Sequence, residues 1–196
     1  MSKTIAPQVH AQISIHAHPS RLYINRLGLW LFILSECFLF AALLSSRYFI
    51  LGLDRPGELN QLLGLGITTV LLLSSLTAYR AEMSAAYGDQ RGFKVNTLAT
   101  LGLGLVFVGG VTVEWLEAFH YFPPSSSFGT LFFTMTGVHA FHVMTGLALL
   151  LLVLIRGHRQ PHFNGQNHWP VEASVKYWHF VDLAWVFIYP TLYLVA

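Results

Sequence analysis

Residues 128–155 read FGTLFFTMTGVHAFHVMTGLALLLLVLI and contain no Lys, Arg, Asp or Glu. A helix that spans a bilayer needs roughly 20 consecutive apolar residues, so this segment is long enough to cross a membrane. Four further apolar segments occur at about residues 27–51, 59–79, 95–116 and 177–196. The pattern predicts an all-α fold, a polytopic membrane bundle of five transmembrane helices.

The composition of the 196-residue chain is typical of a membrane protein. Hydrophobic residues make up 54% of the chain and charged residues only 10%, whereas soluble domains have about 25% charged residues. The formal net charge of +2 is too small to indicate nucleic-acid binding, so we expect no nucleic-acid partner. The single cysteine, Cys37, lies in an apolar segment and has no second cysteine with which to pair.

The distribution of basic residues predicts an orientation. Residues 1–26 are polar and lack the apolar core of a secretory signal, so we expect a polar cytoplasmic tail followed by a five-helix membrane domain at residues 27–196. Nine of the eleven basic residues fall on the side of the N-terminus: Lys3, Arg21, Arg26, Arg80, Arg91, Lys94, Arg156, Arg159 and Lys176. Arg47 and Arg55 fall on the other side. The positive-inside rule therefore predicts a cytoplasmic N-terminus and an external C-terminus.

Polar side chains inside the apolar segments are candidates for chemistry. Glu36 lies near the middle of the first segment, where an ionised acid costs roughly 2.5 to 3.5 kcal/mol, so we expect it to face inward with a partner. His139 and His142 are three residues apart and share a helix face, whereas the two axial ligands of one haem approach it from opposite sides. We therefore expect two imidazoles bonded to adjacent helices, with Glu36 as a candidate partner for one of them. The alternative to a structural role for Glu36 is a role in proton transfer.

Glu117 and His120 form the Glu-x-x-His half-site of di-iron bundles, with Glu114 one turn earlier. No second Glu-x-x-His occurs, so the sequence favours a hydrated acidic cluster over a metal site. His179 and Asp182, three residues apart, are expected to bond to each other or to a neighbouring helix.

Several side chains on the cytoplasmic side are suited to an anionic lipid headgroup, with a three-histidine zinc site as the alternative. These side chains are His158, Arg159, His162 and His168. Small residues at helical spacing predict close contacts between helices. The candidates are Gly102 with Gly109, Gly64 with Thr68, and Gly137 with Gly146.

Four motifs occur in a characteristic order: Ser35-Glu36, Glu-Trp-Leu-Glu at 114–117, Gly-Val-His-Ala-Phe-His-Val at 137–143, and Glu-Ala-Ser-Val-Lys-Tyr-Trp-His-Phe-Val-Asp at 172–182. Together they resemble subunit III of the haem-copper oxidases, the cytochrome c and quinol oxidases that reduce oxygen to water. The short chain resembles the five-helix bacterial form of this family.

The resemblance implies a noncatalytic accessory subunit of a proton-pumping terminal oxidase in aerobic respiratory electron transport. Such a subunit packs on catalytic subunit I, in a complex that includes subunit II, and it lies in the bacterial plasma (inner) membrane. It binds phospholipid and supports proton uptake and stability. It holds no cofactor or metal of its own, because the haem and copper belong to the partner subunits.

By the same resemblance, Glu36 matches the family's carbodiimide-reactive membrane glutamate, and His142 and His162 match residues near bound lipid. Lipid-binding or proton-related roles are also implied for His139, His179 and Asp182. Arg156 and Arg159 flank the expected place of a headgroup-binding arginine.

Three other functions stay open at this point. An accessory protein of nitric oxide reductase shares the five-helix pattern. An independent transporter or proton channel would use Glu36 and the histidines as a relay. A b-type cytochrome would need His139 or His142 to pair with a histidine on another helix.

Overall fold

The structure is a computed structural model and describes residues 20–52, 61–159, 163 and 167–194. These residues form five long helices: α1 (Arg21–Leu51), α2 (Gln61–Ala86), α3 (Gln90–Tyr121), α4 (Ser127–Arg159) and α5 (Trp169–Tyr189). A short π-helix, η1 (Pro190–Leu194), continues directly from α5. The prediction of an all-α fold is confirmed.

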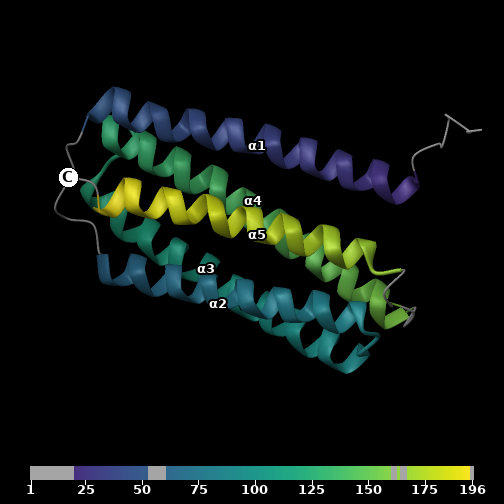
Figure 1. Cartoon of the computed structure of the whole chain (residues 1–196). Helices are drawn as coiled ribbons and strands as arrows, with labels where there is room; N and C mark the ends of the chain where they lie inside the picture. The colour runs from purple at the N-terminus through teal and green to yellow at the C-terminus, as the bar shows by residue number, and fades with distance from the viewer. Residues whose placement is uncertain (1–19, 53–60, 160–162, 164–166, 195–196) are drawn as a thin grey trace, which may run out of the picture.

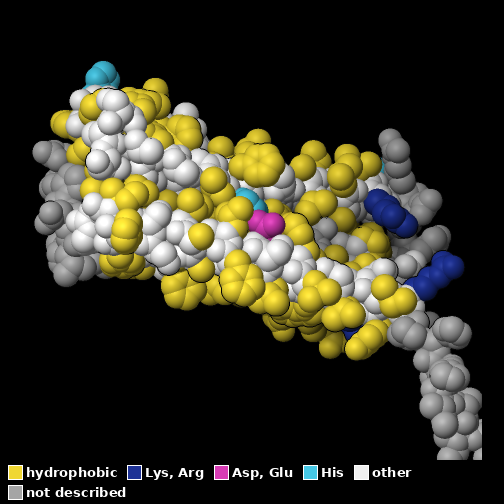
Figure 2. All heavy atoms as spheres, turned by 90° about the horizontal axis from the view of Figure 1, so that it is seen from above, with side chains coloured by type: hydrophobic (Ala, Val, Ile, Leu, Met, Phe, Trp, Pro, Cys, Tyr) yellow, Lys and Arg dark blue, Asp and Glu magenta, His cyan; other side chains and the backbone are white. Residues whose placement is uncertain are grey.

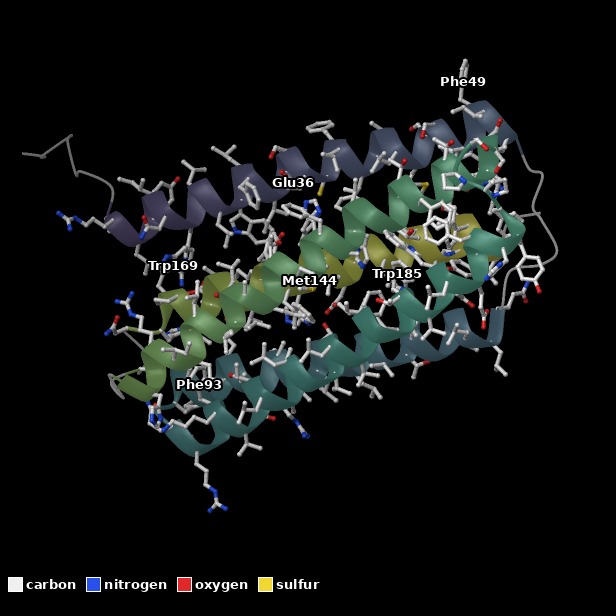
Figure 3. The ribbon with its side chains drawn as sticks, turned by 180° about the vertical axis from the view of Figure 1, so that it is seen from behind. Glu36, Phe49, Phe93, Met144, Trp169 and Trp185 are labelled. Atoms are coloured by element: carbon white, nitrogen blue, oxygen red, sulfur yellow. The ribbon has the colours of Figure 1, made fainter. Side chains whose placement is uncertain are left out.

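Helix α5 lies in the middle of the bundle, between α1 and α4 on one side and the α2–α3 hairpin on the other (Figure 1). Helix α1 packs mainly against α4 and α5, and most of its surface is exposed. Phe49 at its far end points away from the bundle (Figure 3). An apolar helix that covers so little of its surface within the chain must meet lipid or another protein along its other faces.

The hairpin between α2 and α3 is closed by a turn of three residues, 87–89. Gly88 adopts φ +77°, a left-handed conformation that favours glycine. The next residue, Asp89, caps α3 because its side chain accepts a hydrogen bond of 2.9 Å from the backbone N–H of Gly92. The turn therefore sends α3 back along α2.

Four of the helices, α1 to α4, are long and apolar enough to cross a membrane. Helix α5 is 21 residues long but carries Glu172, Lys176 and Asp182 along its length. Every 18-residue stretch of α5 contains all three, whereas each of the other four helices has an apolar stretch of that length with at most two charged side chains. Length and composition thus support four spans directly.

The helices differ from the predicted segments at their ends. Each of the helices α1 to α4 extends past its apolar segment at one end or both, because backbone hydrogen bonding continues into the flanking residues. The largest difference is in the last segment, where α5 begins at Trp169, eight residues before the predicted start at Tyr177. Pro170 does not prevent this extension, because it lies in the first turn of α5, where the missing N–H costs no hydrogen bond.

Helix α5 bonds to α2 through a row of buried hydrogen bonds. The indole N–H of Trp178 donates to Ser74 Oγ at 3.0 Å, and that of Trp185 donates to Thr68 Oγ1 at 2.9 Å. Trp178 and Trp185 are fully buried, and Trp185 lies in the interior of the bundle (Figure 3). Large rings with a polar atom pack well here because small hydroxyl residues let the two backbones approach.

The glycines show where helices meet. A Cβ at Gly64 would lie 3.0 Å from Tyr193, and one at Gly146 would lie 2.8 Å from Trp178, which confirms close contacts at both positions. The prediction for Gly102 and Gly109 is wrong, because both are exposed and a Cβ there would have no neighbour within 4 Å. Packed glycines do occur on α3: a Cβ at Gly104 would lie 2.7 Å from Leu147, and one at Gly110 would lie even closer to Ile67. Gly104 is two residues from Gly102 and therefore on another face of the helix.

Replacing Thr68 by Val should lower the stability of the folded chain by about 1 kcal/mol, because the buried N–H of Trp185 loses its acceptor. The matched control is Thr69→Val. Thr69 is exposed, and its hydroxyl donates only to the Leu65 carbonyl one turn earlier. Thermal unfolding in mild detergent measures both variants, and equal midpoints would mean that the Trp185–Thr68 bond contributes nothing to stability.

Candidate functional site

An open groove of about 950 Å³ lies between helices α1, α4 and α5. Its walls are mostly apolar and include Leu29 and Phe32 of α1 and Phe141 and Leu149 of α4. Figure 2 shows this hollowed face, with an acidic and a histidine side chain together within the apolar surface. An elongated apolar groove with a few polar groups is the usual form of a site for an amphipathic ligand.

Glu36 and His142 are the polar pair at the centre of this groove. Glu36 Oε2 lies 3.0 Å from His142 Nε2, so the expected contact between Glu36 and one of the two histidines is found. Fifteen residues of α1 precede Glu36 and fifteen follow it. The carboxyl therefore lies at the midpoint of the helix, between α1 and α4 (Figure 3).

The second ring nitrogen of His142 determines what the pair can hold. Nδ1 lies 2.7 Å from the carbonyl oxygen of Val138, which only accepts, so Nδ1 must carry a hydrogen and donate it. One further proton then remains for the contact between Nε2 and Glu36. Either a protonated Glu36 donates to Nε2 or a charged imidazole donates to the carboxylate, and the pair is neutral overall in both cases. The geometry thus places one shared proton between Glu36 and His142, near the midpoint of α1.

Two hydroxyl groups extend the polar strip of the groove. The Tyr177 hydroxyl of α5 lies 2.8 Å from Thr145 Oγ1 of α4. Thr145 in turn donates to the backbone oxygen of His142 at 2.8 Å. These contacts connect α4 to α5 beside the Glu36–His142 pair, and they hold in place the turn of α4 that carries His142.

His139 does not reach the groove, although it was predicted on the same helix face as His142. Its ring is fully buried and contacts the rings of Phe40, Phe107 and Trp185. Neither ring nitrogen has a hydrogen-bond partner among the described residues, whereas the sequence led us to expect a bond to an adjacent helix. That expectation is wrong because the side chains around His139 are aromatic.

His179 bonds to a neighbouring helix, as one of the two predicted arrangements required. Its Nδ1 lies 2.6 Å from Ser75 Oγ of α2. Asp182, one turn further along α5, is buried and faces the same hydroxyl. Both residues therefore lie on the side of α5 that faces α2.

Sequence reasoning missed a cluster of charges around Glu172 that fastens α1 to α5. Arg26 of α1 donates to both carboxylate oxygens, at 3.1 and 3.0 Å, and Lys176 also pairs with this carboxylate. His168 lies 3.9 Å away. No local signal reveals the main pair, because 146 residues separate Arg26 from Glu172.

The Glu172 carboxyl lies in the first turn of α5, outside the predicted apolar segment. Burial raises its pKa, but the hydrogen bonds from Arg26 and Lys176 and the attraction of both cations outweigh burial and hold the pKa below its usual range. The carboxylate thus stays ionised at neutral pH and holds the start of α1 against α5.

Replacing Glu172 by Gln should release the first turns of α1, because the bidentate partner of Arg26 is lost. A spin label at Tyr23→Cys, in a Cys37→Ser background, is expected to become clearly more mobile. Glu117→Gln is the control, since Glu117 is exposed and forms no ion pair within the described part of the chain. Unchanged label mobility in Glu172→Gln would show that other contacts hold α1.

The same label should report a pH dependence. A lowered folded-state pKa means that the stabilising contribution of Glu172 is complete above the unfolded pKa, about 4.3, and is lost as the pH falls through the folded pKa. We therefore expect the label to stay immobilised from neutral pH to about pH 5 and to become mobile in stronger acid. A transition near neutral pH would contradict this assignment.

The remaining residues predicted to contact lipid do not form one site. Arg156 and His158 lie on different faces of α4, and the others are outside the described part of the structure. Arg156 is exposed and stands seven residues from Leu149, on the helix face that lines the groove. His158 is exposed on another face. His162 and the side chain of Arg159 are outside the described part of the structure.

At the other end of the bundle, the predicted hydrated acidic cluster is only partly correct. Glu117 and His120 are exposed, but Glu114 is buried and faces Tyr193 of η1. The π-helix after α5 places Tyr193 there, which an apolar pattern does not predict. Among the described residues, no three His, Cys, Asp or Glu side chains lie close enough together to hold a metal ion.

Comparison with known proteins supplies the assignment. Residues 13–196 match the family described as Cytochrome c oxidase subunit III. Cytochrome c oxidase subunit 3 of Thermostichus vulcanus is 32% identical over 201 residues, which cover 100% of this chain and 99% of that protein. The chain belongs to the cytochrome c oxidase subunit III family.

Other family members are similar over most of the chain. The protein of the same name from Synechocystis sp. is 30% identical, over 91% of this chain and 78% of that protein. The one from Mus musculus is 34% identical, over 86% of this chain and 68% of that protein. With helices α1 to α4 each able to span a bilayer, this subunit III family member is a multi-pass membrane protein.

Proposed function

We propose that the chain is a noncatalytic accessory subunit of a proton-pumping haem-copper terminal oxidase. The observation that carries the proposal is the family match over residues 13–196, together with a relative aligned along nearly its whole length. In this assignment the chain packs on the catalytic subunit, in a complex with subunit II. The haem and copper belong to those partner subunits.

We further propose five membrane spans, with a cytoplasmic N-terminus, an external C-terminus and a membrane domain at residues 27–196. Support comes from the position of α5 among four apolar helices (Figure 1) and from its length, about 31 Å at 1.5 Å per residue. Glu172 and Lys176 lie in its first two turns and pair with each other. They lie at the basic end of the bundle, the end that also carries Arg26, Lys94 and Arg156. By the positive-inside rule this end faces the cytoplasm, and in a bacterium the membrane is the plasma (inner) membrane.

In the proposed complex the groove between α1, α4 and α5 binds a phospholipid. Its apolar walls suit acyl chains, while Arg156 lies on the same face of α4 as the groove residue Leu149 and offers charge to a headgroup. The Glu36–His142 pair then serves proton uptake by holding one exchangeable proton on the groove wall. His139, His179 and Asp182 support the same region by packing α4 and α2 against α5.

Copurification tests the assignment. The chain carries an affinity tag, the membrane is extracted in mild detergent, and the reduced-minus-oxidised spectrum is recorded before and after the partners are stripped. Haem absorbance that leaves with a large partner is expected. A preparation that never contains a haem-bearing large subunit would overturn the proposal, and haem that stays on the stripped chain would make its histidines haem ligands.

The same preparation separates the neighbouring functions. Mass spectrometry of the large partner distinguishes an oxygen-reducing enzyme from a nitric oxide reductase. An independent proton channel through Glu36 predicts pH-driven flux in liposomes that contain this chain alone. Our proposal expects no such flux.

A further inference from the structure

A second groove lies between α3 and α4 at the basic end of the bundle. Its volume is about 490 Å³, and its lining residues are Lys94 and Leu98 of α3 and Leu154, Ile155 and His158 of α4. None of these residues lines the groove that contains Glu36. Helix α4 therefore presents one face to each groove.

The rim of this second groove carries basic side chains without partners. Neither Lys94 nor His158 forms a hydrogen bond or ion pair within the described ranges, and His158 is exposed. Arg91, one turn before Lys94 on the same side of α3, is also exposed. Basic side chains from two helices thus border one opening, and the described part of the rim supplies no acid to neutralise them.

Below the rim, the surface of α3 is apolar and shallow. Leu98 is followed at helical spacing by Gly102, Leu105 and Gly109, which share one side of the helix and are all exposed. A Cβ at either glycine would have no neighbour within 4 Å, so the two glycines leave the surface open. From Leu98 to Gly109 the helix rises about 16 Å, close to the half-thickness of a hydrocarbon core, about 15 Å.

We propose that the α3–α4 groove binds an anionic glycerophospholipid, with its phosphate between Lys94 and His158 and one acyl chain along Leu98 and Gly102. This site is separate from the α1–α4–α5 groove and does not depend on the oxidase assignment. The apolar surface of α3 from Leu98 to Gly109 would contribute nothing to the binding of a free phosphate ion. A helix of a protein partner would have to cover three basic side chains at its edge, whereas the phosphate of a lipid lies at the same depth as these side chains.

The test is photolabelling of the purified complex with phosphatidylglycerol that carries a diazirine in one acyl chain. Phosphatidylcholine with the same acyl chain is the neutral-headgroup comparison. After irradiation, mass spectrometry locates the label. We expect phosphatidylglycerol to label residues 98–109 and 151–155, and Lys94→Gln to reduce this labelling about fivefold, the effect of one cation near a membrane surface.

Arg80→Gln is the matched control, because Arg80 is exposed near the same end of the bundle but lines neither groove. It should leave labelling of residues 98–109 unchanged. Equal labelling by the two lipids, no label on α3, or equal loss in both variants would each overturn the proposal. Label on residues 29–39 and 137–149 reports the first groove in the same sample, so failure at one groove is distinguished from failure at the other.

Discussion

Replacing Glu36 by Lys should reduce the recovery of the assembled complex by a factor of about ten or more. The native pair with His142 is neutral overall, because one proton is shared between the carboxyl and Nε2. A lysine at this position adds a net positive charge at the midpoint of α1, with no acid among the lining residues of the groove to offset it. Insertion scales place such a charge at roughly 2.5 to 3.5 kcal/mol.

Glu36→Gln is the matched control for this prediction. Its amide N–H₂ can donate to His142 Nε2, so the contact between α1 and α4 is kept while the exchangeable proton is removed. We expect complex recovery close to that of the unsubstituted chain. The measurement is the amount of tagged chain and of haem eluted from equal quantities of membrane, and equal recovery of the Lys and Gln variants would contradict a partly buried acid facing His142.

The Glu36–His142 contact shows how far sequence reasoning reaches into the site. The position of Glu36 in an apolar segment predicts a partner, and the histidines of the fourth segment supply two candidates. Helical spacing does not decide between them, because residues three apart differ by only about 60° around the axis. The choice depends on where α1 lies, which brings Glu36 to His142 and leaves His139 against Phe107 and Trp185.

The start of α5 shows what local patterns miss. Glu172 lies outside the predicted apolar segment, which begins at about residue 177. A buried carboxylate that attracts Arg26 from the other end of the chain stabilises these first turns. Contacts of this kind arise only when α1 and α5 are already side by side, so apolar periodicity locates the helices but not the charged pairs that fasten them.

Replacing Gly104 by Leu should lower the stability of the bundle by about 3 kcal/mol, at the upper end of the usual cost of overpacking. A Cβ there would already lie 2.7 Å from Leu147 and 2.8 Å from Trp178. Trp178 is fully buried and bonded to Ser74, so it has little freedom to move away. Thermal unfolding of the purified chain in detergent measures the loss.

Gly102→Leu is the control, and it also decides between two interpretations of the same helix. The pair Gly102 and Gly109 has the seven-residue spacing of a packing face, and on that basis its replacement should loosen the bundle. The structure leaves both glycines exposed, so we expect Gly102→Leu to change stability by less than about 0.5 kcal/mol. Similar losses at both positions would mean that α3 turns a different face to α4 and α5. A loss at Gly104 alone would show that the tryptophan of α5, rather than glycine spacing, sets how closely α3 approaches.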